Sequence, residues 1–560
     1  MVAERIAPPG EVITPLDEAA TALAVDELRD AGINSICICF LFAFLNPEHE
    51  VRAGQIARER HPEADITLSH QVTAQYREFE RFTTAAVNAF VKPKVRRYFE
   101  QLARGYREAG FVAPIRVMQS NGGVADIENA GERPVNVLLS GPAAGVIAAK
   151  HLGDTHGHRN LITLDIGGTS ADISLIPGKL VESNPLQNLI GGYPVLAPKL
   201  DVSAIGAGGG SVAWVDPAGA FQVGPRSAGA VPGPACYGKG GTEATVTDAH
   251  VVLGRVDANS YLAGRMTLDT AASHTAVEAI GGKFGMSPPE AALAILRIVN
   301  ANMVREIRVH SIRRGYDPRE CTLVPFGGAG PLHACEVADE LDVPRILVPP
   351  APGVTSARGL LATDLRYDVV RTVSVLLQNA ELPALETTFE DMERDTLSRF
   401  GTDTGPAPTL SRRADCRYAG QGYELPISFD GIDGDWQGKV AESFHAQHMA
   451  EYGFNFPATP IQIVNLRVTA VSAIEARPTT QVPRGGEDPA SARTGSREIL
   501  FSITDGPVTA DTYDRALLVA GNRIDGPAVI NEMDSTVVVT PDFSGEVLGD
   551  GTLLLTRKEA

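Results

Sequence analysis

The clearest chemical signal in the sequence is a strand that ends in an acidic residue followed by two glycines. An apolar run over residues 161–164 delivers Asp165 to a turn that contains Gly167 and Gly168, and a second strand-like run follows at once. Glycines let backbone N–H groups approach an anion closely, and Thr169 adds a hydroxyl donor. The carboxylate of Asp165 can hold a metal ion, directly or through water. The pattern predicts a hairpin that binds phosphate and a cation; the alternative is a tight hairpin with an aspartate in its turn.

A second glycine turn follows further along the chain. A strand-like segment from Thr322 to Pro325 runs into Gly327, Gly328 and Ala329, and Pro331 then stands in the first turn of a predicted helix. Such small residues leave room for a ligand between the strand and the helix. The segment is therefore a second candidate binding site, which comes after the hairpin in chain order.

Two further aspartates, Asp201 and Asp248, stand at the ends of a region rich in glycine and proline. Residues 206–210 are almost all glycine, and residues 224–234 add further glycines and prolines. A bare glycine run can also be a mobile loop. Because an acidic residue at each end is better explained by a cleft, we predict that Asp201 and Asp248 bind a metal ion or orient a substrate.

The cysteines and one pair of histidines carry weaker signals. The six cysteines include no Cys-x-x-Cys pair, so we interpret them as reduced thiols, with a zinc site as the alternative. Cys236 is tied to no histidine by a known arrangement and is interpreted as a packed thiol. His445 and His448 are three residues apart on a predicted helix. That spacing could bind a metal ion but is more often found at a surface or an interface.

The elements that must position these residues alternate between helix and strand. Apolar spacing predicts helices at residues 16–31, 47–61 and 287–313, and a long helical region at 76–109 that Pro93 interrupts. Apolar runs predict strands at residues 36–44, 66–69, 115–119 and 135–139, and a hairpin across residues 161–180. This order of elements is typical of an α/β protein.

The pattern changes near residue 376. A helical stretch to about residue 400 is followed by short segments that predict strands, with one helix from Trp436 to Tyr452. The predicted strands cover residues 411–418, 424–429, 461–472, 498–503, 516–519, 528–530 and 536–539. We therefore divide the chain into residues 1–70, residues 71–375 and a β-rich C-terminal domain at residues 376–560.

The composition excludes several classes of protein. The 560 residues carry a net charge of -19, which argues against nucleic acid as a partner because phosphate neutralisation needs an excess of Lys and Arg. No apolar run reaches the ~18 residues that span a bilayer, and no apolar signal region follows the first residues. We therefore predict a cytoplasmic protein without a membrane segment.

Taken together, these segments resemble the hydantoinase A/5-oxoprolinase family, and the resemblance covers essentially the whole chain. Besides the two glycine turns, the similar stretches are Phe79–Thr84, Met118–Gly123, Ser140–Val146, Ile205–Ser211, Gly233–Gly238, Arg417–Gln421 and Asp534–Thr536. The resemblance implies actin-like ATPase lobes of the ribonuclease H-like kind, joined to a β-rich C-terminal domain. Members of the family use ATP to open cyclic amides such as hydantoins and 5-oxoproline, and many work with a second, B-type subunit in an oligomer.

The resemblance also implies roles for the candidate residues. ATP would be bound with Mg²⁺ or another divalent metal, the phosphates by Gly167, Gly168 and Thr169 and the metal by Asp165. The adenosine would pack on the second turn, at Gly327, Gly328 and Ala329. Asp165, Asp201 and Asp248 are then the catalytic candidates.

The sequence departs from the family pattern in two places. The family normally begins with another Asp-x-Gly-Gly-Thr hairpin, whereas this sequence has only the one at Asp165. We therefore expect that the chain lacks the usual N-terminal segment, that residues 1–70 are the remnant of that region, and that the chain alone binds ATP weakly and turns over little. The second departure is Ser203, where many relatives carry a histidine.

Three hypotheses about function follow. The first is an ATP-dependent cyclic amidase, which family frequency favours. The second is the nucleotide-binding subunit of an ATP-dependent ketone carboxylase. The third is a non-catalytic scaffold for a partner subunit, which the missing first hairpin favours. The residues do not identify the substrate.

Overall fold

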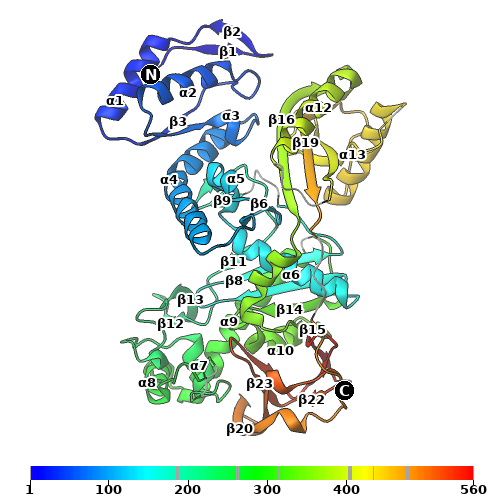
Figure 1. Ribbon diagram of the computed structural model, residues 1–560. Helices are drawn as coiled ribbons and strands as arrows, with labels where there is room; N and C mark the ends of the chain where they lie inside the picture. The colour runs from blue at the N-terminus through cyan, green and yellow to red at the C-terminus, as the bar shows by residue number, and fades with distance from the viewer. Residues whose placement is uncertain are drawn as a thin grey trace. The chain divides into compact units, whose positions relative to one another are not determined.

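A computed structural model describes residues 2–183, 188–259, 261–262, 264–312, 314–400, 406–432, 434–474 and 480–558. The chain forms two compact units, each assembled from three separate stretches (Figure 1). Unit 1 consists of Met1–Ser140, Glu182–Leu200 and Thr363–Glu475, and unit 2 of Gly141–Val181, Asp201–Ala362 and Ala476–Ala560. The division of the sequence into three consecutive domains stays a prediction. The segment after residue 376 contributes to both units.

Unit 2 is built on an eight-stranded sheet in the order β11-β8-β7-β14-β15-β26-β25-β22. β14 is parallel to both β7 and β15, whereas β8 is antiparallel to β7 and to β11. The five strands from β11 to β15, numbered along the chain, therefore stand in the order 3-2-1-4-5 with the second strand reversed. The eight strands are β7 (Asn160–Ile166), β8 (Ala171–Pro177), β11 (Ser203–Ile205), β14 (Thr322–Phe326), β15 (Arg345–Val348), β22 (Arg523–Asp525), β25 (Phe543–Val547) and β26 (Leu553–Arg557).

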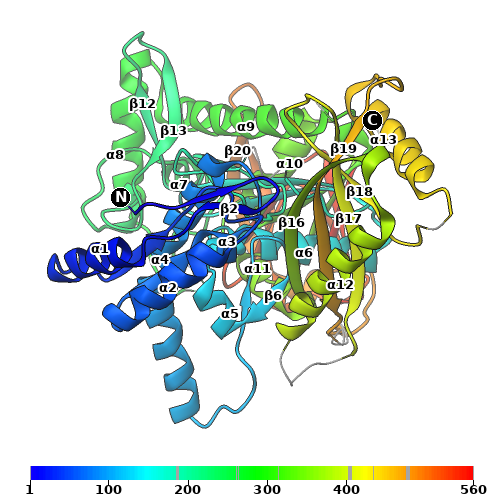
Figure 2. The same ribbon diagram turned by 90° about the horizontal axis from the view of Figure 1, so that it is seen from above.

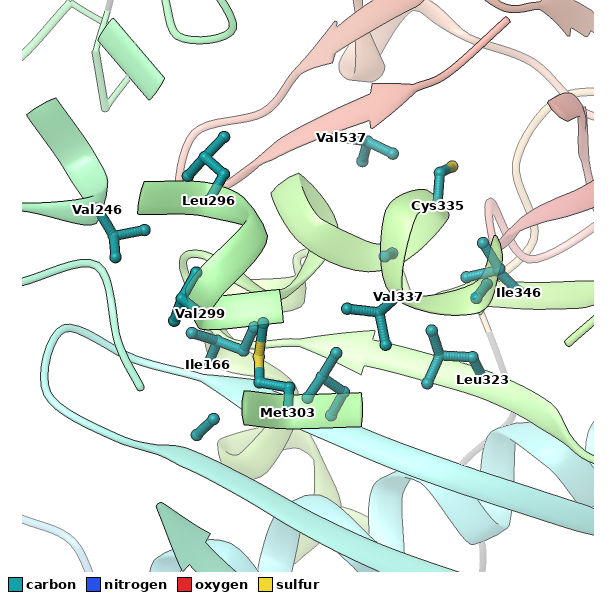
Figure 3. Packing of buried hydrophobic residues seen from close by; sticks show 14 of the residues in the cluster. Ile166, Val246, Leu296, Val299, Met303, Leu323, Cys335, Val337, Ile346 and Val537 are labelled. Carbon is teal, nitrogen blue, oxygen red and sulfur yellow. The ribbon is translucent and has the colours of Figure 1, made fainter. Parts of the chain in front are cut away.

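The helices α9 (Pro288–Ile312) and α10 (Gly330–Glu340) pack on this sheet over the largest hydrophobic core of the structure. The apolar residues of α9 recur every three or four positions, so they form one stripe that faces the strands. Figure 3 shows Val299 next to Met303 on α9, and Val337 of α10 between Met303 and Leu323 of β14. This packing fixes the strand ends that carry both glycine turns.

Smaller elements complete unit 2. The helix α6 (Ser140–Thr155) precedes β7, and Gly145 allows it to lie against the ring of Phe326, because a Cβ there would meet that ring. A four-stranded sheet follows the order β20-β21-β23-β24. The other elements are β12 (Ser211–Val215), β13 (Phe221–Ser227), α7 (Val246–Val252), α8 (Thr270–Gly281), α11 (Thr355–Gly359), β20 (Arg493–Ser502), β21 (Gly506–Asp514), β23 (Ala528–Asn531) and β24 (Thr536–Val539).

Unit 1 contains a six-stranded sheet in the order β18-β17-β19-β16-β6-β5. Figures 1 and 2 show α12 (Leu382–Ser398) and α13 (Trp436–Tyr452) beside its strands. Phe389 of α12 and Phe444 of α13 are buried there against Ile463 and Leu466 of β19. The strands are β5 (Arg116–Met118), β6 (Val124–Asp126), β16 (Leu365–Leu376), β17 (Thr409–Tyr418), β18 (Leu425–Ser428) and β19 (Ile461–Ser472).

The N-terminal part of unit 1 has only small sheets of its own among the residues described. β3 and β4 form a parallel pair, and β1 and β2 an antiparallel pair. A small core of Val25, Ile36, Ala57, Ile66 and Leu68 lies between the β3–β4 pair and its helices. The elements are β1 (Arg5–Ala7), β2 (Glu11–Thr14), α1 (Glu18–Asp30), β3 (Ser35–Ile38), α2 (Glu48–Arg60), β4 (Asp65–Leu68), α3 (Ser69–Val72), α4 (Glu78–Glu108), α5 (Ile127–Glu132), β9 (Leu189–Ile190) and β10 (Tyr193–Pro194).

A buried ion pair explains one of the motifs quoted above. Arg81 in α4 and Glu50 in α2 have no exposed side-chain surface and lie 3.7 Å apart. Glu50 also accepts hydrogen bonds from the backbone N–H of Phe40 (2.9 Å) and from Ser69 and His70. Burial raises the pKa of Glu50, but these donors outweigh it and the net pKa is lowered. The Phe79–Thr84 motif therefore has a structural role through Arg81.

Several local predictions are wrong for identifiable reasons. Residues Pro134–Val137 form a 3₁₀ helix and not a strand, since Pro134 suits a first helical turn and removes a ladder donor. The strand predicted over residues 36–44 ends at Ile38, and Phe42 has a positive φ of 57° that breaks an extended run. Residues Arg515–Leu517 also form a 3₁₀ helix where a strand was predicted.

Gly123 closes the Met118–Gly123 motif, and we predict that Gly123→Ala lowers the free energy of unfolding by about 1–3 kcal/mol. A Cβ at Gly123 would collide with the Cβ of Arg366 and lie 3.3 Å from its Cα, so the strand itself would have to move. The matched control is Gly105→Ala in α4, where nothing lies within 4 Å. That change should stabilise unit 1 by about 0.5–1 kcal/mol through helix propensity. Urea denaturation measures both, and equal effects would contradict the prediction.

Candidate functional site

The two glycine turns lie side by side at the ends of neighbouring strands. β7 and β14 are parallel, and Asp165 pairs with Phe326 in their register. Just beyond the strands, the backbone N–H of Ala329 donates to the carbonyl of Ile166 over 3.0 Å. The structure therefore brings the hairpin and the second turn together, as the binding of one nucleotide by both turns would require. Ligands of open α/β sheets commonly bind at such carboxyl ends of parallel strands.

Asp165 lies beside both turns, and its carboxylate has few hydrogen-bond donors around it. Burial, and after it the nearby carboxylate of Asp172, raises its pKa to about 6, while a weak hydrogen bond from Ser356 (3.4 Å) opposes that shift. A Cβ at Gly327 would collide with Oδ1 of Asp165, and Gly327 has a φ of 76° that disfavours any side chain. The second turn thus needs glycine because it passes directly over this carboxylate.

The hairpin turn presents free backbone N–H groups to its surroundings. Gly167, Gly168 and Thr169 are exposed. Gly167 donates to the carbonyl of Ser170 over 3.0 Å, whereas the N–H groups of Gly168 and Thr169 bond to no other described residue. A Cβ built on Gly168 has nothing within 4 Å. Two unpaired N–H groups beside open space form an arrangement that can receive an anion.

The glycine run at residues 206–210 packs against the back of this turn. The backbone N–H groups of Gly209 and Gly210 donate to the carbonyls of Gly167 (3.0 Å) and Gly168 (2.7 Å). A Cβ at Gly208 would lie only 2.6 Å from the backbone nitrogen of Thr169. The run is therefore glycine-rich because two backbones meet there, and it holds the hairpin turn in one conformation.

Asp248 is fully buried and its carboxylate is surrounded by donors. It completes a capping box with Thr245 at the start of α7. It also accepts hydrogen bonds from the backbone N–H groups of Ala235 (3.1 Å) and Cys236 (2.8 Å) and from the hydroxyl of Ser273 (2.8 Å). These contacts fix the loop at residues 235–236. The catalytic role predicted for Asp248 stays a prediction.

Asp201 precedes β11 and belongs to a separate charged cluster with His310 of α9 and Arg314, which follows α9. Burial raises its pKa, but His310 and Arg314 outweigh that effect and lower it to about 2. Its backbone carbonyl accepts from the hydroxyl of Ser174 (2.7 Å), three residues along β8 from the hairpin turn, or about 10 Å away. The structure does not bring Asp201 to that turn. Within the described residues, no three acidic, histidine or cysteine side chains converge on a metal position.

Sequence reasoning missed an acidic crevice beside the second turn. Its apolar side consists of Val256, Tyr261, Leu262 and Leu332, and its polar side of Asp257, Gly328, Asn531, Glu532, Asp534, Ser535 and Thr536. The only signal was the Asp534–Thr536 segment, which we had noted as part of the resemblance without assigning a role. In the described part of the chain, no helix combines the length and the apolar character that crossing a membrane requires.

These features define a mixed α/β protein in which two glycine turns meet at the carboxyl ends of two neighbouring strands. Comparison with known proteins identifies its family. The hydantoinase/oxoprolinase family model matches residues 81–369, its N-terminal region matches residues 1–61, and its C-terminal domain matches residues 379–560. The chain belongs to the hydantoinase/oxoprolinase family. The match at residues 1–61 corrects our expectation that the family's N-terminal segment is lacking.

Two related proteins and one solved structure are similar to the chain. It is 34% identical to the caprolactamase subunit alpha of Pseudomonas jessenii, over 99% of this chain and 80% of that protein. It is 31% identical to the acetophenone carboxylase gamma subunit of Aromatoleum aromaticum, over 96% and 76%. The crystal structure of the ATP-dependent caprolactamase from Pseudomonas jessenii superposes with a TM-score of 0.87 at 33% identity, covering 100% of this chain and 82% of that one.

Proposed function

We propose that this chain is the ATP-using subunit of an enzyme that opens a cyclic amide. The observation that carries the proposal is the meeting of the two glycine turns around Asp165. The 3-2-1-4-5 strand order with one reversed strand is typical of actin-like ATPase lobes and supports the same reading. The similarity to an ATP-dependent caprolactamase supports both the nucleotide and the amide.

In this proposal the exposed hairpin turn binds the phosphates of ATP. The free N–H groups of Gly168 and Thr169 donate to phosphate oxygens, and the Thr169 hydroxyl adds a donor. The turn does not have to reorganise on binding, because the 206–210 run already holds it. Gly327, Gly328 and Ala329 lie on the adenosine side, where their small size leaves room for the ligand.

Asp165 fits a divalent cation such as Mg²⁺. It is a half-buried carboxylate with one weak protein donor and a second carboxylate, Asp172, nearby, so its charged form lacks a counter-charge. A bound Mg²⁺ would neutralise phosphate charge and orient the triphosphate. Asp165 would hold that ion, directly or through water. Asp248 would serve indirectly by fixing the 235–236 loop, and Asp201 would orient groups near β11.

The chemistry that this site would drive starts from the poor reactivity of an amide carbonyl. Transfer of the γ-phosphoryl group of ATP to the amide oxygen breaks the terminal phosphoanhydride bond and releases ADP. Water then attacks the carbon that bears the phosphorylated oxygen, the ring C–N bond breaks, and the nitrogen takes up a proton and leaves as the amine. A second water hydrolyses the acyl phosphate that remains, which gives the carboxylate and free phosphate. The chain's own part is to position the triphosphate and to place donors where charge develops.

A second, B-type subunit is part of the proposal. Two of the relatives are named as subunits, alpha and gamma, of larger enzymes. We propose that the present chain likewise acts in a hetero-oligomer. The substrate would be a small cyclic amide of the hydantoin, 5-oxoproline or caprolactam kind.

The acetophenone carboxylase relative favours a second candidate function, an ATP-dependent ketone carboxylase subunit. Phosphate release distinguishes the two. A cyclic amidase releases phosphate when a lactam or hydantoin is added, whereas a ketone carboxylase needs a ketone together with bicarbonate. A scaffold subunit would bind no ATP and release none.

The test of the nucleotide site is calorimetric titration of the chain with ATP and Mg²⁺, and Gly168→Ala is the informative variant. The new methyl group meets no protein atom within 4 Å, so the melting temperature should not change. It would enter the space proposed for the phosphates, and the affinity for ATP should fall at least tenfold, or about 1.4 kcal/mol.

The control for this prediction is Gly282→Ala, at the end of α8, which also meets nothing within 4 Å. It should leave both the melting temperature and the affinity for ATP unchanged. An unchanged affinity of Gly168→Ala for ATP would show that the hairpin turn does not bind the phosphates. Absence of ATP binding by the unmodified chain would refute the proposed function.

A further inference from the structure

The crevice beside the second glycine turn has one apolar side and one acidic side. Tyr261, Leu262 and Leu332 line the apolar side, and Glu532 and Asp534 the acidic side. The crevice is continuous with the second turn, since Gly328 is part of its wall. A ligand that bound there would meet apolar side chains and two carboxylates.

The carboxylate of Asp534 is left without a donor. Its two oxygens are buried, and neither accepts a hydrogen bond from any described residue. A buried carboxylate without donors is strongly unfavourable, so the fold retains a group that needs partners from outside the chain.

Arg515, which lies next to Glu532, is bound to other groups of the protein. The guanidinium of Arg515 donates to the backbone carbonyls of Val348 (3.2 Å) and Gly551 (2.9 Å), and its Nη1 lies 3.8 Å from Oε2 of Glu532. Glu532 also accepts from the backbone N–H of Ala351 over 2.7 Å. Glu532 therefore has partners in the protein, whereas Asp534 has none.

Asp534 is held close to the second glycine turn. A Cβ on Gly353 would lie 2.8 Å from Oδ2 of Asp534, so a glycine is needed to admit the carboxylate. The neighbouring Ser535 donates to the carbonyl of Gly328 over 3.4 Å. Gly327, the preceding residue, passes over Asp165. The two aspartates thus both lie beside the second glycine turn.

We infer that Asp534 accepts hydrogen bonds from the two adjacent hydroxyls of the ribose of a bound nucleotide. A vicinal diol offers two neighbouring donors, which match two acceptor oxygens of one carboxylate. Ribose recognition would thus come from a loop between β23 and β24, far in sequence from the phosphate hairpin. This inference rests on the proposed nucleotide site and adds its sugar-binding residue.

The experiment compares ATP, 2′-deoxy-ATP, 3′-deoxy-ATP and inorganic triphosphate by calorimetric titration with Mg²⁺. The unmodified chain should bind ATP about ten- to a hundredfold more tightly than either deoxynucleotide, since each lacks one hydroxyl that bonds to a charged group. Asp534→Asn should bind ATP about as weakly as the deoxynucleotides and bind triphosphate unchanged. Gly168→Ala should instead weaken both ATP and triphosphate.

The matched control is Asp257→Asn in the same crevice wall. Asp257 already has a protein partner, Arg497, at 3.0 Å. Removing the charge of Asp257 should therefore leave the preference for ATP over the deoxynucleotides unchanged. Equal affinity of the unmodified chain for ATP and both deoxynucleotides would overturn the inference while leaving the proposed function standing. A full ribose preference in Asp534→Asn would overturn it as well. If that variant does not fold, the nucleotide series on the unmodified chain decides.

Discussion

Replacing Asp165 by asparagine is expected to lower ATP-dependent phosphate release about a thousandfold or more. Asparagine keeps the shape of the side chain but removes the charge that would hold the cation beside the phosphates. The same change should not destabilise the fold, because it relieves a buried charge whose pKa is already raised to about 6 by burial and by Asp172. Loss of activity without loss of stability is the signature of a functional carboxylate.

The measurement is phosphate release by the chain together with the proposed B-type subunit, with and without 5-oxoproline, hydantoin or caprolactam. The melting temperature is measured on the same proteins. Asp154→Asn is the control, since Asp154 is an exposed residue of α6 in the same unit and pairs only with Lys150. It should leave the rate unchanged. A rate in Asp165→Asn within a few-fold of the unmodified protein would contradict the assigned role.

Arg81→Met is expected to cost about 3–5 kcal/mol of the stability of unit 1, the largest effect on stability that we predict. The change leaves Glu50 charged and fully buried without its cation. Arg52→Met is the control: the Arg52–Glu18 pair lies on exposed surface, with 42% and 53% of the two side chains accessible, and its loss should change the stability far less.

Hydrogen exchange of the backbone amides in β3 and β4 measures the loss of stability in the part of unit 1 that contains Arg81 and Glu50. The double change Glu50→Gln with Arg81→Met should recover part of the stability, because it removes the uncompensated charge. Equal protection in Arg81→Met and Arg52→Met would show that the buried pair does not stabilise this part of the fold.

The sequence could predict the elements whose pattern is local. The long helix α9 and the helix α13 were placed closely because their apolar residues repeat over many turns. The hairpin of β7 and β8 was found because its strands are adjacent in the chain. In contrast, β16 was missed although Arg366 and Asp368 alternate with apolar residues as in a half-buried strand. Its pairing partner, β19, comes about 90 residues later in the chain.

The same distinction applies to the site. Asp165 and the glycines were found because a single turn contains them. The capping box at Thr245 and Asp248 follows a known local pattern and could have been recognised from the spacing alone. Asp534 could not be found in this way. Its importance depends on its lack of donors and on Gly353 and Gly328, which lie about 200 residues earlier in the chain.

The pairing of β15 with β26 has a consequence for synthesis of the protein. β15 ends at Val348 and its antiparallel neighbour β26 begins at Leu553, about 200 residues later. A ribosome adds about 5–20 residues per second, so this edge of the central sheet stays unpaired for on the order of 10–40 s. An open, apolar strand edge is a template for association with other chains. The nascent chain therefore passes through an aggregation-prone interval, in which a chaperone or an early-binding partner subunit would have the most to protect.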